Sequence, residues 1–202
     1  MSLGPNTWRS ALVVTALLLG ACSSTTPSHT AAPSAIHTMP DGAVMSGKSM
    51  GDMASGAEPS QAAKMVCASE VAADIVRILG LSSMPKHSST WAAQIFSCTY
   101  ELPEGQLILS VNDAADAKTG NTYFASLKAK AGNPKPYTGM IGLGLPSYST
   151  PDGKAVFLKD GKTLQVDASG LPARVGHKNK MTSADLAYAV AAAIVACWSE
   201  KP

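Results

Sequence analysis

Apolar residues recur at steps of three and four in three stretches of the chain, which is the spacing of one face of an α-helix. The predicted helices cover residues 58–79, 113–131 and 183–197. Gly80 marks the end of the first helix and Asp113 caps the second. Gly120 is a weak point in the second helix, because glycine lowers helix stability by about 1 kcal/mol relative to alanine. Thr182 or Ser183 caps the third helix.

Shorter runs with alternating apolar and polar residues predict β-strands. These strands cover residues 91–102, 106–111, 155–158 and 163–166. A turn at residues 103–105 joins the first two, and Asp160-Gly161 joins the last two with the two-residue signal of a β-hairpin. Residues 82–90 and 132–146 are rich in polar residues, glycine or proline and predict loops.

The order of these elements indicates the fold class. Strands that are joined by short turns pair antiparallel, and helices that do not alternate with single strands give an α+β fold. We therefore predict a single antiparallel sheet of four to five strands with three helices, in the order α-β-β-α-β-β(-β)-α. The helices are expected to cover one face of the sheet. The folded domain is expected to span residues 58–202.

The start of the chain has the pattern of a secretory signal peptide. Arg9 is the only charged residue before an apolar run at residues 11–21, which is too short to cross a bilayer. The run leads into the sequence Leu-Gly-Ala-Cys at residues 19–22, which resembles the lipobox of bacterial lipoproteins. We expect cleavage to remove residues 1–21 and a lipid on Cys22 to hold the protein on the outer face of the cell membrane. The alternative is an ordinary secretory peptide with a chance cysteine.

Residues 22–57 have the composition of a linker, with many Ser, Thr, Pro, Ala and Gly residues. This linker also carries closely spaced methionines and histidines: His29, His37, Met39, Met45, Met50 and Met53. Thioether and imidazole groups suit copper, and Cu(I) in particular, better than hard cations. Residues 37–45 also resemble methionine-containing segments of extracytoplasmic copper-handling proteins. The linker therefore predicts copper as a ligand. The alternatives are that methionine is merely tolerated in a linker, or that the methionines bind a protein.

The charge balance argues against nucleic acid as a partner. The chain has 16 Lys and Arg against 14 Asp and Glu, and loss of Arg9 leaves 15 against 14, a net charge near +1. Binding along a nucleic-acid backbone needs a stripe of clustered Lys and Arg residues, which this sequence lacks. The catalytic motifs of common hydrolases, metalloproteases and nucleotide-binding enzymes are absent from the sequence. Residues 139–144 are glycine-rich but read as a loop, and His87 and His177 read as solvated loop residues, so we do not expect an enzyme.

The cysteines of the domain lie in a family-like pattern. Cys67 falls in the first predicted helix, and Cys98-Thr99-Tyr100 falls in the strand that follows. This pattern resembles small uncharacterised cell-envelope lipoproteins of high-GC Gram-positive bacteria. The likeness covers most of residues 65–198 and includes Trp91, Leu109-Ser110-Val111, Pro151-Asp152-Gly153 and Cys197-Trp198. It implies an envelope location and a disulfide, and it supplies no catalytic residue.

With Cys22 assigned to lipid, three cysteines remain and allow three pairings. At least one bridge is expected, because thiols outside the membrane tend to be oxidised. The resemblance favours a Cys67–Cys98 bridge. A Cys67–Cys197 bridge is the rival, because both residues lie on apolar helix faces that antiparallel packing would bring together.

These observations predict a lipid-anchored extracytoplasmic binding protein, with copper as the ligand that the linker favours. The alternative is an interaction module that contacts an envelope protein or a cell-wall component without binding metal. The membrane is the expected partner of the lipid on Cys22.

Overall fold

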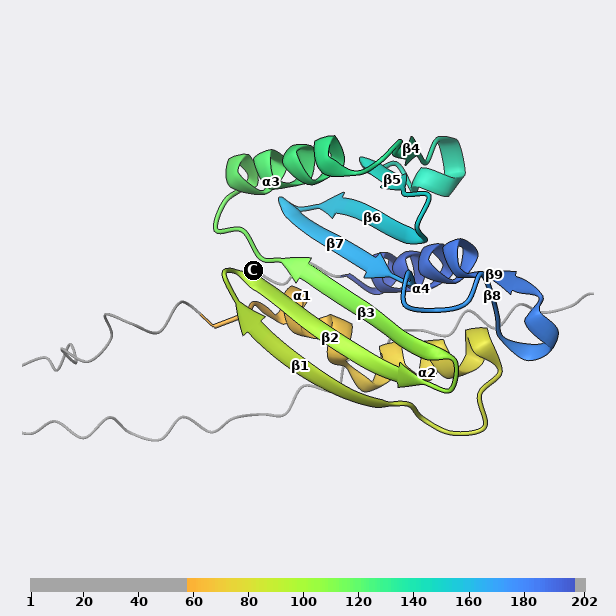
Figure 1. The fold of residues 1–202 in the computed structure, drawn as a ribbon. Coiled ribbons are helices and arrows are strands. Elements are labelled where there is room, and N and C mark those ends of the chain that lie inside the picture. The colour runs from red at the N-terminus through yellow and green to blue at the C-terminus, as the bar shows by residue number, and fades with distance from the viewer. Residues whose placement is uncertain (1–57, 199–202) are drawn as a thin grey trace, which may run out of the picture. The chain divides into compact units, whose positions relative to one another are not determined.

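The computed structural model describes residues 58–198, and Figure 1 shows how their helices and strands are arranged. In chain order the elements are α1 (Gln61–Lys64), η1 (Met65–Cys67), α2 (Ser69–Leu79), β1 (Lys86–Ala92), β2 (Ile95–Leu102), β3 (Gly105–Asn112), α3 (Ala117–Lys130), β4 (Lys135–Pro136), η2 (Gly139–Gly142), β5 (Ser147–Ser149), β6 (Lys154–Lys159), β7 (Lys162–Asp167), β8 (Arg174–Val175), η3 (His177–Asn179), β9 (Met181–Thr182) and α4 (Ser183–Cys197).

Seven strands form one antiparallel sheet in the order β1-β2-β3-β7-β6-β5-β4, and β8 pairs with β9 in a second, two-stranded sheet. The prediction of four to five strands and three helices is therefore wrong, since the described residues form nine strands and four α-helices. Both predicted hairpins are present, β2–β3 across residues 103–104 and β6–β7 across Asp160-Gly161. Pairing of β3 with β7 joins the two hairpins into one sheet.

The missed strands lack the signal that the prediction used. β1 occupies part of the stretch that was expected to be a loop, and all of its residues except Trp91 are exposed. An exposed edge strand buries neither face, so its sequence need not alternate between apolar and polar residues. β4 and β5 contain only two and three residues. Strands this short are too brief for a period of two to be seen.

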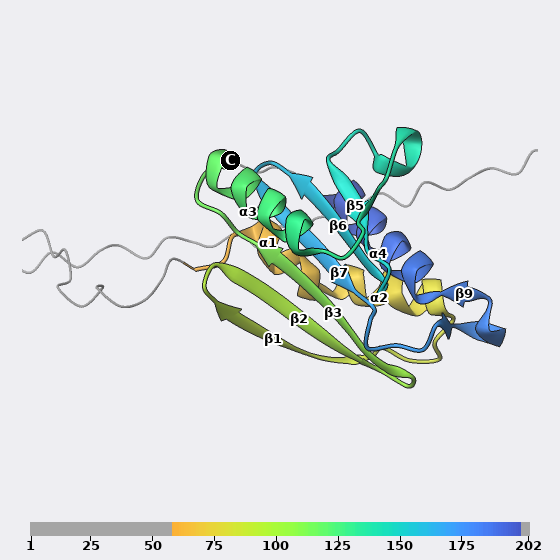
Figure 2. The same ribbon diagram turned by 45° about the horizontal axis from the view of Figure 1, so that its top comes forward.

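The large sheet separates two layers of helices, as Figure 1 and Figure 2 show from two directions. α2 and α4 cover one face, where Ile75, Leu109 and Phe157 belong to the main core. α3 crosses the other face, where Phe124 packs with Tyr148 and Val156 in a smaller cluster. The expectation that the helices share one face is therefore wrong. None of the helices in residues 58–198 has the length and hydropathy that crossing a membrane requires.

The first predicted helix is broken in two near Cys67. The 3₁₀ turn η1 follows α1, and Ala68 is extended with φ −71° and ψ 154° before α2 begins. The backbone carbonyl of Val66 accepts a hydrogen bond from the Tyr100 hydroxyl of β2. The break lets η1 lie against the sheet, which a straight helix through residues 61–79 would prevent.

The second helix begins three residues later than predicted. Asp116 is its N-cap, and the Asp116 side chain accepts a hydrogen bond from the Thr119 backbone N–H at 2.8 Å. Asp113, which the sequence suggested as the cap, instead binds the start of the domain. Its carboxylate accepts hydrogen bonds from the Ser60 backbone N–H at 2.6 Å and from the Lys162 ammonium. The third helix, α4, begins where it was predicted to begin. Thr182, one of the two expected caps, is its N-cap and forms a capping box with Asp185.

Candidate functional site

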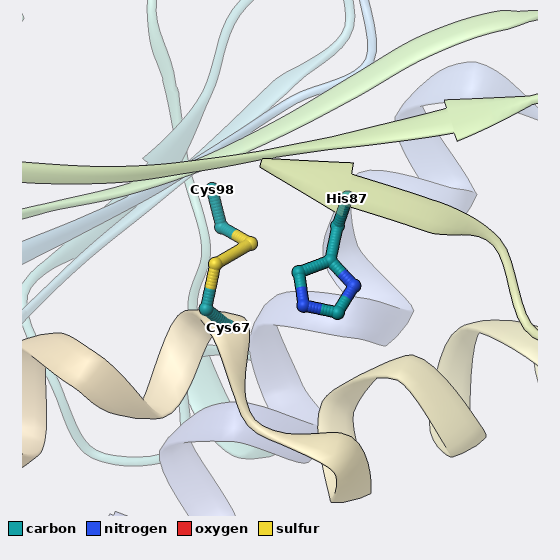
Figure 3. A group of neighbouring side chains, drawn as sticks. All are labelled: Cys67, His87 and Cys98. Atoms are coloured by element: carbon teal, nitrogen blue, oxygen red, sulfur yellow. A yellow bond between two sulfur atoms is a disulfide. The ribbon is translucent and has the colours of Figure 1, made fainter. Parts of the chain in front are cut away.

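A disulfide joins the first helical segment to the sheet. Cys67 at the end of η1 and Cys98 in β2 are bonded, with their Cα atoms 5.4 Å apart, as Figure 3 shows. This confirms the predicted Cys67–Cys98 bridge and excludes the rival bridge between Cys67 and Cys197. Cys98 is fully buried and Cys67 is half-buried, so the bond lies at the edge of the core.

His87 lies beside this disulfide. It comes from β1, where its backbone is opposite Tyr100 of β2, and its ring lies 5.2 Å from the Tyr100 ring between centroids. Strand register places His87 on the same face of the sheet as Cys98, because residues two apart in a strand share a face. The ligand atoms of Cys67, His87 and Cys98 all lie within 4.8 Å of one another (Figure 3).

Tyr100 lies next to this group and contacts both His87 and the residue before Cys67. Its side chain is fully buried, and its hydroxyl donates a 2.8 Å hydrogen bond to the Val66 backbone carbonyl. Burial raises the pKa of Tyr100 to about 12, so the phenol stays protonated and remains a hydrogen-bond donor at neutral pH. The ring also supports the exposed His87 imidazole.

The chemistry of the group depends on the state of the sulfurs. In the oxidised form the two sulfurs are bonded to each other and offer no thiolate to a metal ion. Reduction by a dithiol would provide two thiolates and one imidazole, a donor set that suits Cu(I) or Zn²⁺. The sequence analysis interpreted His87 as a solvated loop residue and did not predict that it lies beside Cys67 and Cys98. Only the β1–β2 register reveals it, because His87 and Cys98 are not close in the sequence.

A groove also opens between the end of α3 and the sheet. It has a volume of about 490 Å³ and is lined by residues of α3, β5, β6 and β7, among them Leu127, Tyr148 and Lys154. The charge of Lys154 is already compensated, because its ammonium lies 2.9 Å from Asp152 and 3.5 Å from Asp167. These ion pairs raise the pKa of Lys154, chiefly through the hydrogen bond to Asp152. Lys154 is therefore not available as a positive charge for a ligand in the groove.

The residues that were singled out in the linker and the signal peptide lie outside the described residues. They are Cys22, His29, His37, Met39, Met45, Met50 and Met53. The lipid anchor and the copper site of the linker therefore stay predictions.

Comparison with known proteins adds no further identification. No protein family model, curated protein or solved structure matches the chain.

Proposed function

We propose that this protein is a lipid-anchored extracytoplasmic binding protein that binds copper through its Met/His linker. The observation that supports a location outside the cytoplasm is the Cys67–Cys98 disulfide. Disulfides form and persist outside the cytoplasm, where thiols are not kept reduced. A lipobox-like sequence at residues 19–22 gives the same location and adds a membrane anchor on Cys22.

The anchor is tested by mass spectrometry of the mature N-terminus. Cleavage before Cys22 and a diacylglycerol mass on that cysteine are expected. In cells, Cys22→Ser should remove the lipid and shift the protein out of the membrane fraction. Cleavage at another bond, or an unmodified Cys22 on the mature chain, would contradict the anchor.

Copper binding rests on the donor chemistry of the linker. Four methionines and two histidines lie within residues 29–53, and thioethers favour Cu(I). The mature chain should take up Cu(I), compete for it with a Cu(I)-specific chelator, and ignore Zn²⁺. Imidazole binds a metal only when neutral, so any share of the affinity that comes from His29 and His37 should fall below about pH 6.5.

The decisive variant changes Met39, Met45, Met50 and Met53 to leucine, which keeps length and hydropathy but removes the sulfurs. A matched control changes Met84 and Met140 of the folded domain to leucine and should bind copper like the parent. If the linker variant also binds like the parent, the linker is not the copper site. Loss of binding in His87→Ala but not in the linker variant would transfer the site to the Cys67–His87–Cys98 group.

A second candidate is an interaction module for an envelope protein, and the outer edge of β1 favours it. β1 is seven residues long and forms one end of the sheet, and among residues 58–198 its pairing partner is β2 alone. An exposed edge offers backbone N–H and C=O groups to an added strand of a partner. A photo-crosslinking residue at Thr90 should then trap one defined envelope protein in cells, and the same residue at Glu104 should not. Equal crosslinking from both positions would speak against this function.

A further inference from the structure

Exposed apolar side chains are concentrated in one turn, between β4 and β5. Four large apolar residues are exposed in the described part of the chain, and three of them lie in a single turn. These are Met140, Ile141 and Leu143, with exposed fractions of 93%, 54% and 43%, and we call them the apolar turn. Met84 is the fourth, at 56%, and lies in the loop before β1. Single exposed apolar residues are ordinary, but a cluster usually marks a contact site.

The apolar turn is held in place by the surrounding structure. It contains η2 and projects beyond β4 and β5, as Figure 1 shows in teal. The Leu143 N–H donates to the Met140 carbonyl at 3.1 Å, and the Leu145 N–H donates to the Gly142 carbonyl at 2.9 Å. Before the turn, Tyr137 stacks on Phe157 with ring centroids 5.6 Å apart. The turn is therefore anchored at its base.

Close packing and an unusual backbone conformation constrain the backbone of the turn. A Cβ at Gly142 would lie 2.8 Å from the Tyr137 carbonyl oxygen, so the backbone passes too close to Tyr137 for a side chain at residue 142. Leu143 has φ +54°, a left-handed conformation that leucine rarely adopts. The residue in this conformation is 43% exposed.

The segment that carries the turn is basic. Residues 117–151 contain no Asp or Glu and four lysines, which are Lys118, Lys128, Lys130 and Lys135. Lys130 and Lys135 are exposed and precede the turn, and the Lys128 ammonium lies 5.9 Å from the Tyr148 ring. The carboxylate of Asp185 interacts electrostatically with Tyr137 at the base of the turn. This carboxylate also accepts a hydrogen bond from the Thr182 hydroxyl of the capping box.

We propose that the apolar turn is a membrane contact that inserts into a surface of anionic lipid. Met140, Ile141 and Leu143 would enter the boundary between headgroups and acyl chains, and Lys130 and Lys135 would face the phosphates. Apolar side chains flanked by lysines are the combination by which peripheral proteins bind anionic membranes. This inference goes beyond the proposed function and does not depend on a lipid at Cys22. The two are therefore tested separately.

The test uses the full mature chain with Cys22→Ser, so that no acyl chain contributes to binding. It is mixed with vesicles of phosphatidylcholine alone or with added phosphatidylglycerol, and the bound fraction is measured by sedimentation. The parent should bind the phosphatidylglycerol vesicles and bind poorly to phosphatidylcholine. Each lysine near an anionic surface contributes about a fivefold factor, so Lys130→Gln with Lys135→Gln should weaken binding clearly.

The decisive variant is Met140→Ser with Ile141→Ser, which removes exposed side chains and leaves the core intact. It should lower partitioning at least about tenfold, because each large apolar side chain that enters lipid contributes strongly. Met84→Ser removes an exposed methionine elsewhere and should bind like the parent. In a separate variant, Ile141→Trp fluorescence should be quenched by lipids with brominated acyl chains.

Two results would overturn the inference. One is equal vesicle binding by the parent and the double serine variant. The other is a parent that ignores phosphatidylglycerol but self-associates through the turn, with dissociation in the double serine variant. That outcome would assign the turn to contact between copies of this chain.

Discussion

The hydroxyl of Tyr100 donates a 2.8 Å hydrogen bond to the backbone carbonyl of Val66, the residue before Cys67. Both residues are fully buried, so this bond and the disulfide together fix η1 against β2. The carbonyl lies where the helix is broken, and the hydroxyl replaces the partner that a continuous helix would supply.

Tyr100→Phe should therefore destabilise the domain while leaving its fold intact. The substitution keeps the buried ring but leaves the Val66 carbonyl without its partner, which costs about 1–3 kcal/mol. Urea unfolding followed by circular dichroism measures this loss. Tyr123→Phe, in α3 on the other side of the sheet, is the control and should change stability less. If both variants lost the same unfolding free energy, the hydrogen bond of Tyr100 would not contribute to stability beyond what an ordinary tyrosine hydroxyl contributes.

Loss of the disulfide should weaken the domain more strongly. Cys67 and Cys98 are 31 residues apart, and closing a loop of this length contributes about 3–4 kcal/mol by chain-entropy estimates. Cys67→Ala with Cys98→Ala should lower the unfolding free energy by that amount. A dithiol should destabilise the parent in the same way. Non-reducing peptide mapping should recover the two cysteines in one fragment pair.

Asp113 should make the stability of the domain depend on acid pH. Burial by itself raises the pKa of Asp113, but hydrogen bonds from Lys162 and Ser60 and the charge of Lys162 outweigh it and hold the pKa below its ordinary value. A carboxylate with a lowered folded pKa adds stability that is fully present above its unfolded pKa of about 3.9. That stability is lost as pH falls through the lower, folded value.

Asp113→Asn should therefore lose about 2 kcal/mol at neutral pH, which is typical of a hydrogen bond to a charged group. Its unfolding free energy should also decline less than that of the parent as pH falls below about 4. Glu104→Gln, at an exposed position in the β2–β3 turn, is the control and should follow the parent curve. A parallel decline in Asp113→Asn and the parent would exclude Asp113 as the source of the acid sensitivity.

The seating of α3 on the sheet should depend on Gly120. A Cβ at this position would lie 1.5 Å from the Gly161 carbonyl oxygen in the β6–β7 turn, which is far inside contact distance. Gly120→Ala should thus cost about 2 kcal/mol or more through overpacking, although alanine is the better helix former. At Gly132, where a Cβ would have no neighbour within 4 Å, alanine should change stability by no more than about 0.5 kcal/mol. Thermal unfolding of the two variants makes the comparison.

Gly120 also illustrates what sequence patterns can and cannot predict. In the sequence it was a weak point of a helix, whereas in the structure it is the point where α3 approaches the β6–β7 hairpin. Local signals correctly predicted the hairpin at Asp160-Gly161 and narrowed the cap of α4 to Thr182 or Ser183, of which Thr182 is the cap, because short-range backbone chemistry decides both features. The close approach depends on two segments about forty residues apart, so no local pattern could reveal it.

The candidate site divides in the same way. The Cys67–Cys98 pairing followed from a resemblance to a family and is confirmed. His87 was missed because β1 is an exposed edge strand with no apolar alternation, so its register with Tyr100 could not be seen. The apolar turn was recognised as a loop, but periodicity does not tell whether Met140 and Ile141 lie inside or outside the core.

The contact of Ser60 with Asp113 and Lys162 has a mechanical consequence. Any pull on the chain before residue 58 reaches the folded domain at the cap of α1, and the load passes at once to the sheet. Ser60 transmits it through its N–H and hydroxyl to Asp113, which follows β3, and from there to Lys162 at the start of β7. These strands are neighbours at the centre of the sheet. Tension applied to the chain before residue 58 would thus be carried by the middle of the sheet, and the short helix α1 would be protected from being unwound first.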